Sequence, residues 1–266
     1  MTQAQRRHYL LRALLAERPE YRDLSVPAQE SDQKILLRSL MNLRPPAPIS
    51  QEFLTVQDDY LQEALRERGI TTLEELNPVM DGIYLWRGDI TTLQCGAIVN
   101  AANAGLTGCY TPCHGCIDNA IHTYAGVQLR LACGELMARQ GHAEPPGGAK
   151  LTPAFNLPCQ YVLHTVGPIV SGPVTRKDRD LLAACYRACL TLAEEQDIDS
   201  VAFCCISTGE YHFPQTLAAE IAVQTVLAFR AEFQSNIKVI FNVFKESDYH
   251  IYRKLLAGGT AAPPGP

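Results

Sequence analysis

The sequence lacks a long hydrophobic run and lacks an excess of basic residues. No stretch approaches the ~18 consecutive apolar residues that a membrane-spanning helix needs. The 23 Lys and Arg residues are outnumbered by 28 Asp and Glu, and the formal net charge is −5. Nucleic acids and anionic membranes normally bind a basic face, so this balance argues against both kinds of partner.

A cleavable signal segment is also missing from the first residues. Arg12 interrupts the apolar run Tyr9-Leu10-Leu11 almost at once, whereas a signal peptide has an apolar stretch of about 7–15 residues. We therefore expect a cytoplasmic protein, and we expect it to be a monomer. In a reducing compartment the ten cysteines are better read as free thiols or metal ligands than as a disulfide framework.

The first 80 residues are built differently from the rest of the chain. Helix-like apolar spacing is present at 9–15, 35–40 and 53–68, and the second and third of these segments are separated by the helix breaker Arg44-Pro45-Pro46-Ala47-Pro48. We expect a helical extension over residues 1–80. It either packs as a covering layer or also shapes the mouth of a substrate site.

From residue 81 to residue 256 the pattern alternates between strands and helices. Apolar runs predict strands at 83–86, 97–99, 161–164, 201–206 and 239–244, and helical spacing predicts helices at 117–139, 177–195, 217–233 and 248–256. Such alternation is typical of an α/β sandwich with a mainly parallel sheet. The small residues and prolines of 257–266 predict a flexible tail.

A loop rich in metal-capable side chains follows the predicted strand at 97–99. It contains Cys109, Cys113, His114 and Cys116 within eight positions. Zinc prefers thiolate and imidazole ligands, and a catalytic zinc keeps one coordination position open. Neighbours in an extended segment point to opposite sides, so Cys113 and His114 do not share a site easily. On this spacing alone, a metal site and a set of small buried thiols are equally open. If a metal binds, we expect one Zn²⁺ per chain on Cys109, His114 and Cys116.

Several motifs resemble, in order, those of the macrodomain family, which binds ADP-ribose. They cover about residues 82–256 and read Gly88-Asp89-Ile90-Thr91, Ala97-Ile98-Val99-Asn100-Ala101-Ala102-Asn103, Ile117-Asp118-Asn119-Ala120-Ile121-His122, His164-Thr165-Val166-Gly167-Pro168 and Ser207-Thr208-Gly209 followed by Phe213-Pro214. The resemblance implies a macrodomain-like three-layer α/β/α sandwich with a mixed, mainly parallel sheet.

One departure from the family pattern is informative. Most macrodomains carry a run of glycines where this chain has Cys-Tyr-Thr-Pro-Cys-His-Gly-Cys at 109–116. In this respect the chain is similar to the zinc-dependent macrodomains of bacteria and fungi, which hydrolyse protein-linked ADP-ribose.

The resemblance also implies roles for individual residues at the nucleotide end of the ligand. Asp89, with Ile90 beside it, would accept a hydrogen bond from the adenine amino group. Phe244 would lie against the adenine, with packing in the core as the alternative. The loop after the strand at 201–206 would bind phosphate through backbone N–H groups, and its residues are Ser207, Thr208, Gly209, Glu210 and Tyr211.

At the distal ribose, the resemblance points to Asn103, Asp118 and Phe213. Asn103 would bind the ribose hydroxyls, and Phe213 would face the sugar. Asp118 is either a helix cap or a group that positions ribose or water, and we expect the second. Asn100 is better suited to holding the loop, as an Asn in a turn does.

These expectations combine into one function and two alternatives. The chain would be a zinc-dependent hydrolase that removes mono-ADP-ribose from modified proteins by cleaving the O-glycosidic bond at the distal ribose, releasing ADP-ribose. A non-catalytic reader of ADP-ribose with a structural zinc is the main alternative. A zinc nucleobase deaminase, suggested by Pro112-Cys113-His114-Gly115-Cys116 and His142-Ala143-Glu144, is disfavoured because the two motifs occur in the reverse order.

Overall fold

The computed structural model describes residues 1–21 and 23–258. Most of the tail predicted at 257–266 lies outside the described residues. Within them, no helix combines the length and the apolar character needed to cross a bilayer.

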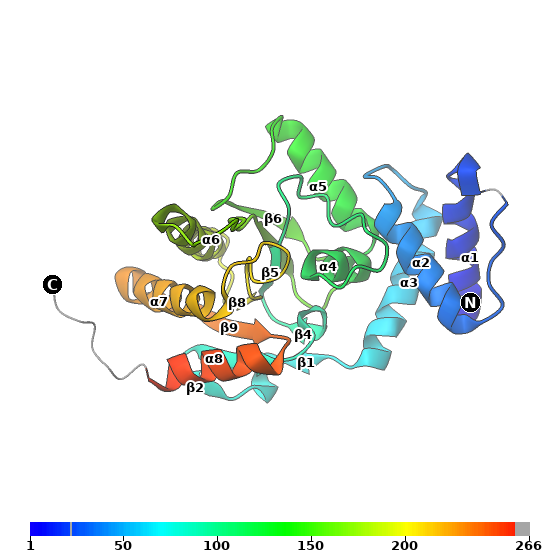
Figure 1. The fold of residues 1–266 in the computed structure, drawn as a ribbon. Coiled ribbons are helices and arrows are strands. Elements are labelled where there is room, and N and C mark those ends of the chain that lie inside the picture. The colour runs from blue at the N-terminus through cyan, green and yellow to red at the C-terminus, as the bar shows by residue number, and fades with distance from the viewer. Residues whose placement is uncertain (22, 259–266) are drawn as a thin grey trace.

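A seven-stranded sheet with the order β2-β3-β9-β8-β5-β7-β6 forms the centre of the molecule (Figure 1). Its strands are β2 (Pro78–Met80), β3 (Ile83–Arg87), β5 (Ala97–Ala101), β6 (Ala149–Pro153), β7 (Tyr161–Thr165), β8 (Ser200–Phe203) and β9 (Lys238–Val243). The two edge strands, β2 and β6, pair antiparallel with their neighbours, and all other pairs are parallel. The predicted mixed, mainly parallel sheet is confirmed.

Helices cover both faces of this sheet, which confirms the predicted three-layer sandwich. In Figure 1, one layer lies to the left of the sheet and the other to its right. The left layer consists of α6 (Arg176–Glu195), α7 (Gln215–Phe233) and α8 (Glu246–Ala257), and the right layer of α4 (Ile117–Ala125) and α5 (Val127–Gln140).

The central strands carry runs of buried apolar residues because neither face of the sheet meets water. Ile98, Val99, Val201 and Ile240 are each 0% exposed. Polar side chains such as Asn100 occur near the carboxyl ends of these strands.

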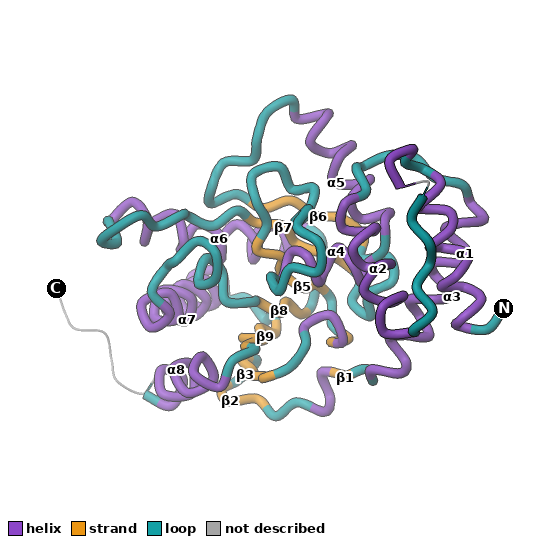
Figure 2. The backbone as a smooth tube through the Cα atoms, turned by 45° about the vertical axis from the view of Figure 1, so that its right-hand side comes forward, coloured by secondary structure: helices purple, strands orange, loops and turns teal. Residues whose placement is uncertain are grey.

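The N-terminal helices form a separate layer outside α4, as Figures 1 and 2 both show. They are α1 (Gln3–Ala16), α2 (Glu30–Leu43) and α3 (Gln51–Arg68). Their apolar faces pack into a hydrophobic cluster of their own, which also includes Val127 at the start of α5. The predicted helical extension is therefore present as a packed layer.

Short elements lie between the longer helices and strands. They are η1 (Pro19–Tyr21), β1 (Thr71–Thr72), η2 (Leu73–Glu75), η3 (Ile90–Thr92) and β4 (Leu93–Gln94). β1 pairs with β4, and β2 pairs with β3. Residues 71–80, which we expected in the helical extension, thus pair with strands of the main domain.

Three other details differ from the sequence prediction. The helix predicted at 117–139 is two helices, because Gly126 between them has φ +94°. Strand β6 was not predicted, since Pro153 and the preceding Pro-Pro-Gly-Gly obscure an edge strand. The strand predicted at 201–206 ends at Phe203, although Cys204 and Ile206 are also buried.

Candidate active site

The candidate site lies at the carboxyl ends of four parallel strands. Asp89 follows β3, Asn100 and Asn103 lie at and after the end of β5, Ser207 follows β8, and Phe244 follows β9. In open α/β sheets, ligands bind at this edge. The strand order makes β8 the neighbour of both β5 and β9, so the loops that follow these strands converge.

The loop between β5 and α4 carries the metal-capable residues, and we call residues 109–116 the cysteine loop. A turn closes it, with the backbone N–H of His114 donating to the carbonyl of Thr111 at 3.2 Å. Cys113 sits in this turn with φ +53°. Cys116 caps the N-terminus of α4, and its sulfur accepts from the backbone N–H of Asn119 at 3.4 Å.

Three side chains of this loop bring their donor atoms together. The sulfurs of Cys109 and Cys116 and a ring nitrogen of His114 all lie within 4.8 Å of one another. Cys109 Sγ is 3.6 Å from His114 Nδ1, and a tetrahedral zinc with ordinary bond lengths separates sulfur and nitrogen ligands by about 3.5 Å. The donor set and its spacing therefore fit a zinc ion.

The other cysteine of the loop points away from this group. Cys113 Sγ lies 3.3 Å from Ser39 Oγ and 3.6 Å from the carbonyl of Ile35, both on α2. Cys113 and His114 thus point to different sides as expected, but the cause is a turn in which Cys113 has φ +53° and not the alternation of an extended segment.

The surroundings of the three candidate metal ligands affect the pKa of Cys116 and the orientation of His114. Burial raises the pKa of Cys116 to about 12, and metal ligation requires loss of that thiol proton. His114 Nε2 lies 3.6 Å from Glu210 Oε1. With Nδ1 directed at Cys109, this is the arrangement in which a carboxylate orients a metal-binding imidazole.

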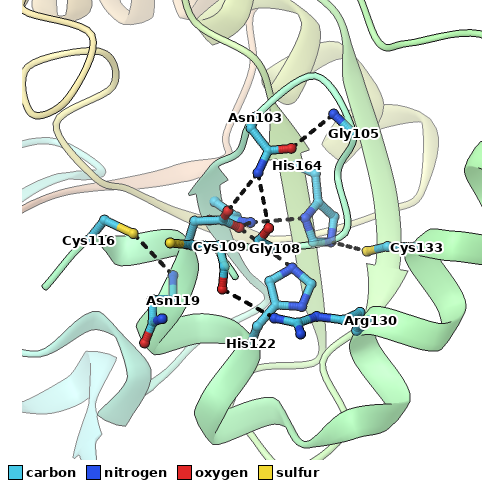
Figure 3. A network of polar contacts seen from close by, with 12 residues as sticks. Asn103, Gly105, Gly108, Cys109, Cys116, Asn119, His122, Arg130, Cys133 and His164 are labelled. Atoms are coloured by element: carbon cyan, nitrogen blue, oxygen red, sulfur yellow. Dashed lines mark hydrogen bonds and ion pairs between the residues drawn. The ribbon is translucent and has the colours of Figure 1, made fainter. Parts of the chain in front are cut away.

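A buried polar network lies beside the cysteine loop (Figure 3). Asp118 Oδ1 accepts from Asn100 Nδ2 at 2.8 Å, and Asp118 Oδ2 accepts from Asn103 Nδ2 at 3.4 Å. Asn103 also donates to the carbonyl of Gly108 and accepts from the N–H of Gly105. Burial raises the pKa of Asp118 to about 6. Both Asn100 and Asn103 therefore hold Asp118, and Asn103 also holds the loop.

The loop after β8 runs through a tight turn that starts at Ser207, whose φ is +63°. Ser207 Oγ is buried and has no hydrogen-bond partner among the described residues. A Cβ at Gly167 would lie 1.9 Å from this oxygen, so only glycine allows the two segments to approach. Burial, followed by the charge of Asp118, raises the pKa of Tyr211.

Other residues of this loop lie in different environments. Thr208 Oγ1 donates to the carbonyl of Cys205 at 3.0 Å, and Gly209 accepts from the N–H of His212. Phe213 is 1% exposed and packs in the main hydrophobic cluster. The expected position of Phe213 beside the distal ribose stays a prediction.

The residues expected at the adenine also differ in accessibility. Asp89 caps η3, accepting from Thr91, and forms a 3.0 Å ion pair with Arg68. The side chain of Ile90 is only 2% exposed. Phe244 is 80% exposed, which excludes the alternative that it packs in the core.

Sequence reasoning missed Arg130, which joins the site to the N-terminal helices. Its buried guanidinium donates to the carbonyls of Cys109, Arg44 and Met41 at 3.3, 2.7 and 3.3 Å, and also to that of Asn42. Burial lowers the pKa of Arg130. A signal was available, because Arg130 lies three residues from both Val127 and Cys133 on the buried face of α5.

A second group of metal-capable atoms is formed by His122, Cys133 and His164, all buried. Both ring nitrogens of His164 are occupied, Nδ1 by Asn100 at 3.2 Å and Nε2 by Thr152 at 2.9 Å. Those contacts, and the cationic Arg130 nearby, make this group a poorer metal site than the cysteine loop.

The fold and the site together define a three-layer α/β/α domain whose strand-end loops carry a candidate metal centre. The chain belongs to the Macro domain family, which it matches over residues 99–222. It is 58% identical to a protein-ADP-ribose hydrolase of Treponema medium over 261 residues, covering 97% of this chain and 100% of that protein.

Two further relatives extend this picture. A protein-ADP-ribose hydrolase of Staphylococcus aureus is 47% identical over 251 residues, covering 94% of each chain. The crystal structure of a Trypanosoma brucei macrodomain in complex with ADP-ribose has a TM-score of 0.64 and 32% identity, covering 82% of this chain and 94% of that one.

Proposed function

We propose that this chain is a zinc-dependent hydrolase that removes mono-ADP-ribose from modified proteins. In the reaction, the bond between the anomeric carbon of the distal ribose and the protein side-chain oxygen breaks. The oxygen of water bonds to that carbon, and a proton from water passes to the leaving oxygen. The products are ADP-ribose and the unmodified side chain. The relatives named protein-ADP-ribose hydrolases support this substrate class.

The observation that carries the proposal is the convergence of Cys109, His114 and Cys116 at the strand-end site. Two thiolates and one imidazole leave a tetrahedral zinc with one position for an oxygen ligand. A zinc ion held there would supply a Lewis acid that polarises a ribose or water oxygen.

The protein's own groups would orient the reacting sugar. In the proposal, Asn103 binds the distal ribose hydroxyls, and Asp118 positions the ribose or the attacking water. Asn100 supports this role because it holds the Asp118 carboxylate at 2.8 Å in a fixed direction. Fixing the reactants in this way removes much of the entropic part of the barrier.

The rest of the ligand would occupy the neighbouring loops. The buried Ser207 Oγ lacks a partner in the described part of the chain, which suits a loop that binds a polar ligand. Thr208, Gly209 and Tyr211 would contribute backbone contacts to the diphosphate. Asp89 and the exposed Phe244 would bind the adenine.

The test is to replace Cys116 with serine. Serine keeps an N-cap acceptor for α4 but is a poor zinc ligand. We expect bound zinc to fall from one per chain to a small fraction, and ADP-ribose release to slow by at least about 100-fold. ADP-ribose affinity should change only a few-fold. Release is measured by mass spectrometry on peptides carrying ADP-ribose on Asp, Glu, Ser or Arg.

Cys113→Ser is the matched control, because it alters the same loop outside the donor group. Its rate should stay within about twofold of the parent. If Cys116→Ser hydrolyses all substrates at the parent rate, the metal has no catalytic role. If the parent binds ADP-ribose and zinc but releases nothing, the chain is a reader with a structural zinc.

A further inference from the structure

Helix α2 of the N-terminal layer contacts the cysteine loop through Arg38. Its Nη2 donates to the carbonyl of His114 at 3.1 Å and to Asn119 Oδ1 at 2.7 Å, and its Nε donates to the same Asn119 oxygen at 3.2 Å. One guanidinium therefore joins the backbone of His114, a candidate metal ligand, to the first turn of α4.

Asn119 extends this contact to Cys116, a second candidate metal ligand. Its backbone N–H donates to Cys116 Sγ, as Figure 3 shows, and its Nδ2 donates to the carbonyl of Thr111 at 3.0 Å. Arg38 thus acts on His114 directly and on Cys116 through Asn119. His114 and Cys116 supply two of the three candidate metal-ligand atoms.

A second residue of α2 holds the turn of the loop. Asn42 lies one helical turn after Arg38 and therefore on the same face. Its Oδ1 accepts from the backbone N–H of Cys113 at 2.9 Å, and its Nδ2 donates to Thr123 Oγ1 on α4 at 3.0 Å. Asn42 is only 1% exposed, so water does not compete for these bonds.

We propose that α2 is a positioning element for the metal centre, with Arg38 as its principal positioning residue and Asn42 as a second. This inference rests on the proposed function and assigns a role to the N-terminal layer. A charged guanidinium that binds two acceptors fixes their distance and direction better than a single neutral donor. Loss of such supporting contacts typically weakens metal binding by about 10–100-fold.

The experiment measures metal binding rather than turnover, and compares Arg38→Ala with Lys34→Ala. Lys34 lies on the same helix, one turn earlier, and pairs with Glu30. Zinc affinity is obtained by competition with a chromophoric chelator. We expect Arg38→Ala to weaken zinc binding by about 10–100-fold and Lys34→Ala to stay within about twofold of the parent.

The absorption spectrum of bound cobalt(II) reports the geometry of the metal ligands, which a general loss of stability would not change. In the folded Arg38→Ala variant, the cobalt d–d and thiolate charge-transfer bands should shift in position and intensity, because the ligands are no longer held in one geometry. Arg38→Lys keeps the charge but gives up the two-acceptor fork. It should therefore bind zinc with an affinity between those of the parent and Arg38→Ala.

The outcomes separate this inference from the proposed function. If Arg38→Ala is folded by circular dichroism and matches Lys34→Ala in zinc affinity and cobalt spectrum, α2 does not position the centre. If Arg38→Ala does not fold, Arg38→Lys decides in the same way. A parent protein that binds no zinc overturns the proposed metal centre itself.

Discussion

The buried residue His164 makes the stability of the fold depend on pH. It is 0% exposed on β7, and burial lowers its pKa from 6.5 to about 4. Between those values the unfolded chain binds a proton that the folded chain does not, so stability falls as the pH falls. The free energy of unfolding should drop by about 2 kcal/mol from this residue alone between pH 7.5 and pH 5.

The measurement is urea unfolding from pH 7.5 to pH 4.5 in the presence of a chelator, so that proton competition for a metal makes no contribution. His164→Gln should be less stable at pH 7.5 but should lose less stability on acidification. The groups that face His164, which are His122, Cys133 and, through Asn100, Asp118, remain in both proteins. Parallel pH profiles for the parent and the variant would contradict the assignment.

At the residue scale, the sequence was most informative where local geometry decides. The expectation that Cys113 and His114 point apart selected Cys109, His114 and Cys116, and the structure brings these three together, although a turn at Cys113 replaces the extended segment we had assumed. It was least informative where tertiary packing decides, as for the buried Phe213 and the exposed Phe244. Both are aromatic residues beside the same sheet edge. The roles of the candidate site residues remain predictions.

At the scale of elements, the break between α4 and α5 depends on Gly126. Its backbone has φ +94° and ψ +173°, a region that is almost confined to glycine. A Cβ there would lie 2.6 Å from Gln57 Nε2. The same Gln57 accepts from the first N–H of α5, at Val127, at 2.9 Å. Gly126→Ala should therefore cause backbone strain and also disturb this cap.

Gly69→Ala is the matched comparison for Gly126→Ala. Gly69 has a similar backbone, with φ +83° and ψ +150°, and nothing lies within 4 Å of its potential Cβ. Gly69→Ala should lower the free energy of unfolding by about 1–3 kcal/mol from strain alone. Gly126→Ala should cost about 1–2 kcal/mol more, from the Gln57 contacts. Equal losses in urea unfolding would show that Gln57 adapts without cost.

Element prediction succeeded where burial produces a clear pattern and failed where it does not. The fully buried central strands were all located, although β8 was extended too far. Helical spacing continues across Gly126, so the sequence predicted one helix where a backbone reversal makes two. Strand β6 is an edge strand with only Thr152 buried, and a half-exposed strand that ends in proline has no apolar alternation to detect.

At the scale of the whole molecule, Arg130 joins two separately packed regions. It donates to carbonyls on both the N-terminal layer and the cysteine loop. Arg130→Met keeps much of the volume but leaves these buried acceptors without a donor. We expect the free energy of unfolding to fall by about 2–4 kcal/mol.

Hydrogen exchange would identify where Arg130→Met acts. The amides of α1 to α3 should lose more protection than those of the central strands, because the layer is released before the sheet opens. Arg176→Ala, which removes an exposed pair with Asp180, should change stability by no more than about 0.5 kcal/mol. A uniform loss of protection in Arg130→Met would mean that the two regions unfold as one unit.

The N-terminal layer was also the largest part of the molecule whose role the sequence left open. Its helices were predictable from their apolar spacing. Their attachment was not, because many of the contacts of Arg38, Asn42 and Arg130 are to backbone carbonyls and amides, which carry no residue-specific signal. Contacts between residues 71 to 81 positions apart are likewise invisible to a local pattern.

These long separations have a consequence for how the protein is made. Helix α2 leaves the ribosome before the cysteine loop and α4 exist, so Arg38 and Asn42 spend that interval in water without their native partners. The loop takes its final shape only when a segment synthesised much earlier docks against it. If the proposed metal centre forms, capture of its ion would therefore be a late event in biosynthesis, because a nascent chain that stops before α4 is complete has thiols but lacks the contacts from α4 that shape the loop.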